Sequence, residues 1–127
     1  MSRRVVITGI GVLAPNGNGV RDFELALRKG LSGIRVHEKM VECGFGSHVA
    51  GVPQGIDELA ESYFSDDLLL AMNSGHRCAA IAGVDAWKDA GFERPDPDDE
   101  RVDWDTGAVL GTGIGGMDTI ANAVVPL

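Results

Sequence analysis

The sequence predicts an α/β fold, in which buried strands alternate with helices. Two short apolar runs, Val5–Ile7 and Ala108–Leu110, each lead into a glycine-rich turn, as central strands of a covered sheet do. Between them, Ser65–Ala90 carries apolar residues three or four positions apart, which indicates a long helix. Strands that are apolar on both faces need helices on both sides, so this alternation favours the α/β class.

The composition narrows the classes of protein to which the chain can belong. Its 127 residues are enough for one domain, and 44% hydrophobic with 24% charged residues is ordinary for a globular protein. A net charge of −8 disfavours nucleic acid and anionic membranes as partners. No segment has the length of a membrane helix or the layout of a signal peptide, so we expect no membrane partner and a cytoplasmic location.

The first part of the chain is expected to form a strand and then a helix. The β-branched start of Val5–Leu13 favours a central strand, and the Pro, Asn and Gly content of residues 14–19 ends it. Helical spacing follows over Val20–Lys29, with Asn18 as a possible N-cap and Gly30 in position to stop the helix.

The middle of the chain gives weaker signals. Residues 35–46 show no sustained period and are expected to be an irregular connection. Residues 47–52 alternate enough for a short strand, and Pro53 directly after them argues for an edge position. Residues 54–64 hold enough apolar residues at helical spacing for a turn or two of helix.

The longest element is expected at Ser65–Ala90, as a helix of about seven turns with acids in its first turn. Small side chains recur along it three or four positions apart, at Gly75, Ala79, Gly83 and Ala86. One face of this helix is therefore expected to let another element come very close.

Two segments follow the long helix. Residues 92–105 hold seven acids in fourteen residues and are expected to form a solvated surface loop. After the second glycine-rich turn, a helix is expected to begin at Met117 and to turn Ile120, Ala123 and Val124 inward.

That second turn holds four glycines within six residues, at Gly111, Gly113, Gly115 and Gly116, and its backbone can approach a ligand closely. It satisfies the dinucleotide-binding pattern G-x-G-x-x-G, and residues 9–14 satisfy the looser form that ends in alanine. A pattern that fits twice in one short chain discriminates little, since tight strand-to-helix turns explain both matches. A nucleotide-binding module stays an alternative, although no convincing acidic residue ends a second strand about 20 residues after the first turn.

The residues supply no catalytic constellation of their own. His37, His48 and His76 are scattered without metal-ligand spacing, so no metal site is expected. Cys78 lies among small apolar residues of the long helix, where a buried structural thiol is expected, and Cys43 lies in a loop. Two cysteines are too few for a disulfide framework.

Four ordered blocks carry a specific resemblance. They are Arg4–Gly17 (RVVITGIGVLAPNG), Leu31–Ile34 (LSGI), Lys88–Gly91 (KDAG) and Gly111–Gly116 (GTGIGG). In their order and spacing, the chain closely resembles the N-terminal portion of β-ketoacyl-acyl carrier protein synthases across essentially all 127 residues. Gly46–Gly51 is similar to the FabB-type branch and Gly113–Gly116 to the FabF-type branch, so the subtype stays open.

The resemblance implies the N-terminal half of a thiolase-like fold, which in the complete family is layered α-β-α-β-α and dimeric. It implies decarboxylating Claisen condensation in fatty acid or polyketide synthesis, with substrates carried on the phosphopantetheine of acyl carrier protein and no other cofactor. The family's catalytic cysteine and two histidines belong to motifs beyond Leu127. We therefore expect residues 1–127 to be the N-terminal part of a synthase domain, truncated before the catalytic cysteine, inactive alone and poorly stable without its covering half.

One site carries over from the family residue by residue. Ile114 falls where the family lines its acyl pocket near the dimer interface, with Gly113, Gly115 and Met117 around it. The resemblance also implies acyl carrier protein as a partner, and a homodimer or a heterodimer with another subunit of the same fold.

The chain departs from the family at Ser65–Asp67, where elongating synthases tend to carry basic residues that dock the acidic carrier protein. Acids at this position cap a helix and complement its dipole, which explains them without any functional role. A non-catalytic partner subunit, resembling the chain-length factors that pair with a synthase, stays an alternative because it would tolerate the loss of docking.

Overall fold

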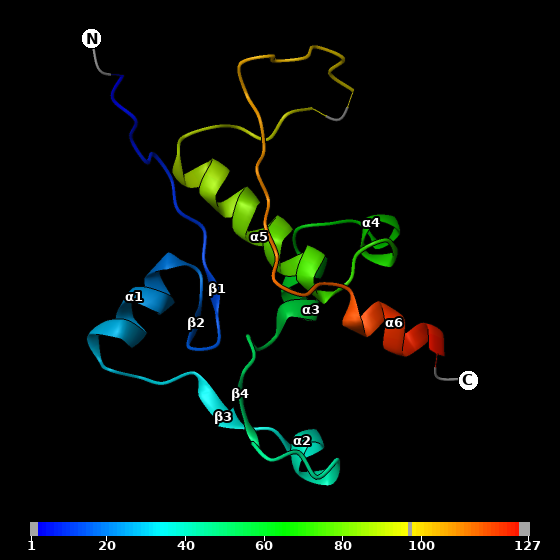
Figure 1. Ribbon diagram of the computed structural model, residues 1–127. Helices are drawn as coiled ribbons and strands as arrows, with labels where there is room; N and C mark the ends of the chain where they lie inside the picture. Colours follow the sequence, from blue (N-terminus) through cyan, green and yellow to red (C-terminus); the bar gives the residue numbers. More distant parts are fainter. Residues whose placement is uncertain (1–2, 97, 125–127) are drawn as a thin grey trace.

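The computed structural model describes residues 3–96 and 98–124, and it combines helices with short antiparallel strands (Figure 1). In chain order, its elements are β1 (Leu13–Ala14), β2 (Gly17–Asn18), α1 (Val20–Arg28), β3 (Ile34–Val36), α2 (Glu38–Glu42), β4 (Val49–Gly51), α3 (Ile56–Glu61), α4 (Asp66–Leu70), α5 (Ser74–Asp89) and α6 (Met117–Val124). This mixture of helix and strand is compatible with part of an α/β fold. None of the helices in the described ranges has the length and apolar character that crossing a membrane requires.

The strands form two separate antiparallel pairs. β1 and β2 make a tight hairpin, in which Leu13 pairs with Asn18. β3 pairs with β4, and Arg35 lies opposite Ala50 in that ladder. The strand predicted within residues 47–52 is confirmed, whereas the irregular connection predicted for residues 35–46 is wrong, because it contains most of β3 and all of α2.

The two buried strands predicted at Val5–Leu13 and Ala108–Leu110 are wrong. Among the described residues, only Leu13 of these two segments lies in a strand, and the Val5 and Val109 side chains are 93% and 101% exposed. A strand forms only where a neighbouring strand accepts and donates its backbone hydrogen bonds, and apart from Leu13 neither segment has such a neighbour in the part of the chain described. An apolar run specifies the tendency to form a strand but not the partner.

The segment before β1 nevertheless packs closely on α5. A Cβ atom at Gly11 would overlap the carbonyl oxygen of Ala82, and one at Gly9 would overlap that of Ala86. The Ile10 N–H donates to a carboxylate oxygen of Asp89, 2.9 Å away. The predicted close approach to a small-residue face is therefore present.

The small residues that make this approach differ in part from those predicted. They are Ala82, Ala86 and Ala90, of which only Ala86 was expected, and a Cβ at Gly83 would have no atom within 4 Å.

The long helix predicted over Ser65–Ala90 is wrong in one respect, because it is two helices. α4 ends at Leu70 and α5 begins at Ser74. The Asn73 side chain accepts the backbone N–H of His76 at 2.9 Å, so it caps a new helix instead of continuing the old one.

The positions of three other helices were predicted correctly, whereas the N-cap of the first one was not. α1, α3 and the start of α6 lie where they were predicted, and the described residues of the 92–105 segment contain no helix or strand. Asn18 is not the N-cap of α1, because it pairs in β2 and Gly19 occupies the cap with a φ of 90°.

The inward face predicted for α6 is also wrong. Ile120 and Val124 are 55% and 73% exposed, and Ala123 is exposed as well. Since no other element of the described residues covers this face, the helix exposes its apolar side to solvent.

Little of the molecule is buried. Ala26, Ala60 and Ile81 are the buried apolar residues of the described chain. The solvent-accessible surface is 10759 Å², whereas a folded monomer of this mass is expected to expose about 6500 Å². Figure 1 shows one cause: the β3–β4 pair with α2 extends away from α5 instead of folding onto it.

Candidate functional site

The glycine-rich segment leads directly into α6. Residues 107–116 form no helix or strand, and Gly116 has a φ of 74°, a left-handed conformation that favours glycine. The Gly116 carbonyl accepts the Ile120 N–H at 3.0 Å and so closes the first turn of α6. Gly116 is thus the glycine of this segment whose conformation demands the residue.

The residues predicted to line an acyl pocket lie together on this short segment. Ile114 is 84% exposed and Met117 is 58% exposed. A Cβ at Gly113 would have no atom within 4 Å, and one at Gly115 would contact only the nearby Thr112 side chain. The described residues therefore offer one apolar wall that faces solvent and do not enclose a pocket.

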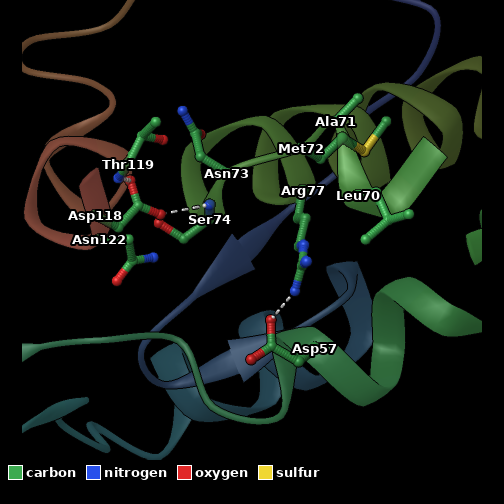
Figure 2. Close-up of a pocket in the computed structure, with 10 residues that line it drawn as sticks. All are labelled: Asp57, Leu70, Ala71, Met72, Asn73, Ser74, Arg77, Asp118, Thr119 and Asn122. Atoms are coloured by element: carbon green, nitrogen blue, oxygen red, sulfur yellow. Dashed lines mark hydrogen bonds and ion pairs between the residues drawn. The ribbon is translucent and has the colours of Figure 1, made fainter. Parts of the chain in front are cut away.

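A cleft of about 450 Å³ lies beside this segment, where α3, α4, α5 and α6 meet (Figure 2). Its lining is Asp57, Leu70, Ala71, Met72, Asn73, Ser74, Arg77, Asp118, Thr119 and Asn122. The break between α4 and α5 supplies one side of the cleft, and the first turns of α6 supply another. The break between α4 and α5, which the sequence did not predict, and the start of α6, which it did, thus meet at one place.

On the α6 side of the cleft, a carboxylate joins two helix starts. One oxygen of Asp118 accepts the Ser74 N–H at 2.9 Å, and the other accepts the Thr119 N–H at 3.0 Å. The pKa of Asp118 is held below its ordinary value, first by the hydrogen bond from the Ser74 backbone. Because a helix N-terminus carries partial positive charge, both bonds favour the ionised carboxylate.

On the α3 side, an ion pair crosses the cleft. Arg77 donates from Nη1 to Asp57 at 2.5 Å and from Nη2 to the Leu69 carbonyl at 3.2 Å. Figure 2 shows the Arg77 and Asp57 side chains pointing toward each other across this opening. The guanidinium is thus already engaged by a carboxylate and a carbonyl.

The chemistry available in the cleft is that of structural polar contacts. Its charged side chains are Asp57, Arg77 and Asp118, and the first two are paired with each other. Across residues 3–96 and 98–124, no group of three or more His, Cys, Asp or Glu side chains could hold a metal ion.

The surroundings of Cys78 disfavour nucleophilic chemistry. Cys43 is exposed at the C-terminal end of α2, and Cys78 is half-buried on α5. Burial, and then the negative charge of Asp57, raise the pKa of the Cys78 thiol. A raised pKa keeps the thiol protonated, which lowers its reactivity.

Sequence reasoning missed the residues that join α5 to α6. An acid in the first turn of a helix, such as Asp118, is a local signal. It predicts the start of the helix that contains it and not a contact with another helix. The contact of Asp118 with Ser74 spans 44 positions, and no local pattern predicts it. Asn73 was detectable, since asparagine before a helical run is a preferred N-cap.

Comparison with known proteins identifies the family. Residues 2–125 match the family described as Beta-ketoacyl synthase, N-terminal domain. The 3-oxoacyl-[acyl-carrier-protein] synthase 2 of Vibrio cholerae serotype O1 is 36% identical over 118 residues, which cover 93% of this chain and 27% of that protein. The synthase of the same name from Coxiella burnetii is 34% identical over 124 residues, with the same coverage of both chains.

A relative named for polyketide synthesis has a similar percentage identity. The Putative polyketide beta-ketoacyl synthase 1 of Streptomyces halstedii is 36% identical over 127 residues, which cover 98% of this chain and 28% of that protein. The chain thus spans little more than a quarter of the length of these curated relatives. It belongs to the β-ketoacyl synthase family, whose N-terminal domain it matches along nearly its whole length.

Proposed function

We propose that residues 1–127 are the N-terminal part of a β-ketoacyl-acyl carrier protein synthase domain, folded in that protein as half of a thiolase-like α-β-α-β-α assembly. The family match over residues 2–125 carries the proposal. The exposed apolar segments around Val5 and Val109 support it, since they offer apolar side chains to a covering half.

The proposed reaction joins two thioesters by a decarboxylating Claisen condensation. A catalytic cysteine of the full-length protein first attacks the thioester of acyl-acyl carrier protein, which transfers the acyl group to the cysteine and releases the carrier's thiol. Malonyl-acyl carrier protein then loses CO₂, and its carbanion attacks the acyl carbonyl carbon. The new carbon–carbon bond gives β-ketoacyl-acyl carrier protein, and the cysteine leaves as thiolate. The catalytic cysteine and two histidines are proposed to lie outside residues 1–127.

The contribution of this chain is to hold the acyl group. Gly113, Ile114, Gly115 and Met117 are proposed to line the acyl pocket near the dimer interface. The 84% exposure of Ile114 supports this role, because a second surface can cover the side chain. That surface would come from the rest of the synthase or from the partner subunit of a homodimer or heterodimer.

Acyl carrier protein is the proposed partner, as the names of the relatives imply for those proteins. Asp66 and Asp67 begin α4 as exposed acids, and an acidic carrier protein would be repelled there. Carrier docking is therefore proposed away from the start of α4.

The packing of the glycines argues against a nucleotide-binding module. Gly9 and Gly11 face the backbone of α5, so their missing side chains allow helix packing instead of phosphate binding. At the second turn, the Asp118 carboxylate already accepts the Thr119 N–H at the start of α6. Its negative charge would repel a phosphate from that position.

The full-length protein that carries this segment tests the proposal. Incubated with acyl- and malonyl-acyl carrier protein, it should release CO₂ and form β-ketoacyl-acyl carrier protein, both measurable by mass spectrometry. Ile114→Trp should reduce the use of long acyl chains by about tenfold or more and spare short ones, since filling a pocket excludes larger substrates. No condensation by the folded full-length protein would contradict an active synthase.

A non-catalytic partner subunit of the same fold is the second candidate, favoured by the acidic start of α4. It would have a residue other than cysteine at the nucleophile position. It would also form a heterodimer with an active synthase, which size-exclusion chromatography of the two co-expressed proteins would detect.

A further inference from the structure

One pair of residues holds the glycine-rich segment to the rest of the molecule by hydrogen bonding. Among the described residues, Ser74 is the single residue outside residues 107–124 that hydrogen-bonds to this segment, and its N–H donates to Asp118. No ion pair joins the two parts within the described ranges. The placement of this segment therefore depends on one carboxylate.

The carboxylate lies where two helices begin. Asp118 is the second residue of α6, and Ser74 is the first residue of the 16-residue helix α5. Asn73 accepts the His76 N–H from its own helix, so the start of α5 is capped once from within and once by α6. Figure 2 shows Asp118 directed from α6 toward Ser74. Charge and geometry agree, because an anion is favoured at a helix N-terminus.

The contact between the starts of α5 and α6 also positions the backbone that precedes α6. A Cβ at Gly116 would lie 3.7 Å from the Asn73 side-chain nitrogen, so this turn also meets the start of α5. Further upstream, a Cβ at Gly107, Gly111 or Gly113 would have no atom within 4 Å. The location of Ile114, four positions before Asp118, is therefore set from the α6 end.

We propose that Asp118 is a positioning residue, which seats the glycine-rich segment on the start of α5 and thereby sets how long an acyl chain Ile114 and Met117 accommodate. The acyl-chain part rests on the proposed function, whereas the seating rests on the contacts alone. Asp118 touches no substrate in this scheme and acts through the placement of the segment.

The first experiment measures the seating directly. Hydrogen exchange by mass spectrometry is followed in the full-length protein, in peptides that contain Ser74 and residues 111–120, for Asp118→Ala and Asp118→Asn. Asp118→Ala should speed exchange in both peptides by about tenfold, the loss expected for one hydrogen bond to a charged group. Asp118→Asn keeps an oxygen that can accept the Ser74 N–H, so it should retain most of the protection.

A matched control removes the same charge elsewhere. Asp22 is exposed in the first turn of α1, and Asp22→Ala should leave exchange at Ser74 and residues 111–120 unchanged. Unchanged exchange in Asp118→Ala would overturn the proposal, as would equal acceleration by Asp22→Ala.

The second experiment measures selectivity for acyl length. The measured quantity is the ratio of kcat/KM for a long acyl-acyl carrier protein to kcat/KM for a short one. In Asp118→Ala this ratio should move toward unity by about tenfold, mainly through a change in KM. In Asp118→Asn the ratio should return in large part to that of the unsubstituted protein. A role in general stability would lower kcat/KM for both lengths alike, and an unchanged ratio would overturn the acyl-chain part of the proposal. If the unsubstituted protein condensed nothing, the proposed function would fail together with the acyl-chain part, and exchange at Ser74 would still decide the seating.

Discussion

At the scale of single residues, the contact between Tyr63 and α5 is a tyrosine paired with a carboxylate. The Tyr63 hydroxyl donates to Asp85 at 2.7 Å. This hydrogen bond, then burial and the charge of Asp85, raise the pKa of Tyr63 above its ordinary value of 10.0. The folded structure thus favours the neutral phenol. The contact stabilises the fold fully below the unfolded pKa and is lost as the pH rises through the folded pKa.

This contact can be titrated in the full-length protein, as the difference in absorbance between that protein and its Tyr63→Phe variant. The ultraviolet absorbance of tyrosinate should rise with a midpoint above 10.0 in the native chain. In concentrated urea, or after Asp85→Ala, the midpoint should return toward the ordinary value. An equal midpoint in native and urea-unfolded chains would mean that the pair does not form.

The two cysteines provide a second prediction at this scale. Cys43 is exposed and Cys78 is half-buried, with a pKa raised by its burial. In the full-length protein, a thiol reagent at neutral pH should therefore modify Cys43 in a fast phase and Cys78 in a slow one, followed by mass spectrometry of their peptides, because the thiolate is the reactive form. Cys43→Ser should remove the fast phase and Cys78→Ser the slow one. Urea should merge the phases, whereas a single phase in the native chain would show that α5 does not shield Cys78.

At the scale of elements, the packing of the first segment on α5 depends on an absent side chain. A Cβ at Gly11 would overlap the Ala82 carbonyl oxygen, and that backbone atom cannot move without disturbing the helix. Gly11→Ala is therefore expected to destabilise the protein by about 1–3 kcal/mol, as overpacking does.

A glycine on the same helix provides the matched control. A Cβ at Gly83 would have no atom within 4 Å, so Gly83→Ala should stabilise α5 by up to about 1 kcal/mol through helix propensity. The midpoints of urea unfolding of the full-length protein should move in opposite directions for the two variants. A shift of the same sign in both would refute the close packing of Gly11.

The elements also show where sequence reasoning reaches its limit. α1 and the start of α6 follow from signals within a few residues, and both were predicted. The strand expected at Ala108–Leu110 depends on a partner that lies elsewhere, and the apolar run alone does not supply it. The helix break at Asn73 shows that one capping side chain can outweigh a long apolar period.

For the candidate site, the sequence identifies the glycine-rich segment but not the contact that holds it to α5. The four glycines and Met117 lie on one segment because they are neighbours in the sequence. The bond between Asp118 and Ser74 joins two helix starts across 44 positions, and only the folded chain brings them together.

At the scale of the whole molecule, the exposed surface sets the expected stability. The chain exposes 10759 Å², roughly two thirds more than a folded monomer of 13.4 kDa is expected to expose. Its buried apolar residues, within the described ranges, are two alanines and Ile81. Since burial of apolar surface is the main favourable term in folding, this core is too small to offset the entropy of ordering the chain.

The isolated 127-residue chain is therefore expected to lack a cooperative thermal transition and to bind a dye specific for exposed apolar surface. Circular dichroism at far- and near-ultraviolet wavelengths should show helix without fixed tertiary packing. The full-length protein should melt sharply and bind little dye, because a covering half would bury the segments around Val5 and Val109. A sharp transition of the isolated chain, with sedimentation showing a monomer, would contradict this expectation, since it would require the exposed surface to close on itself.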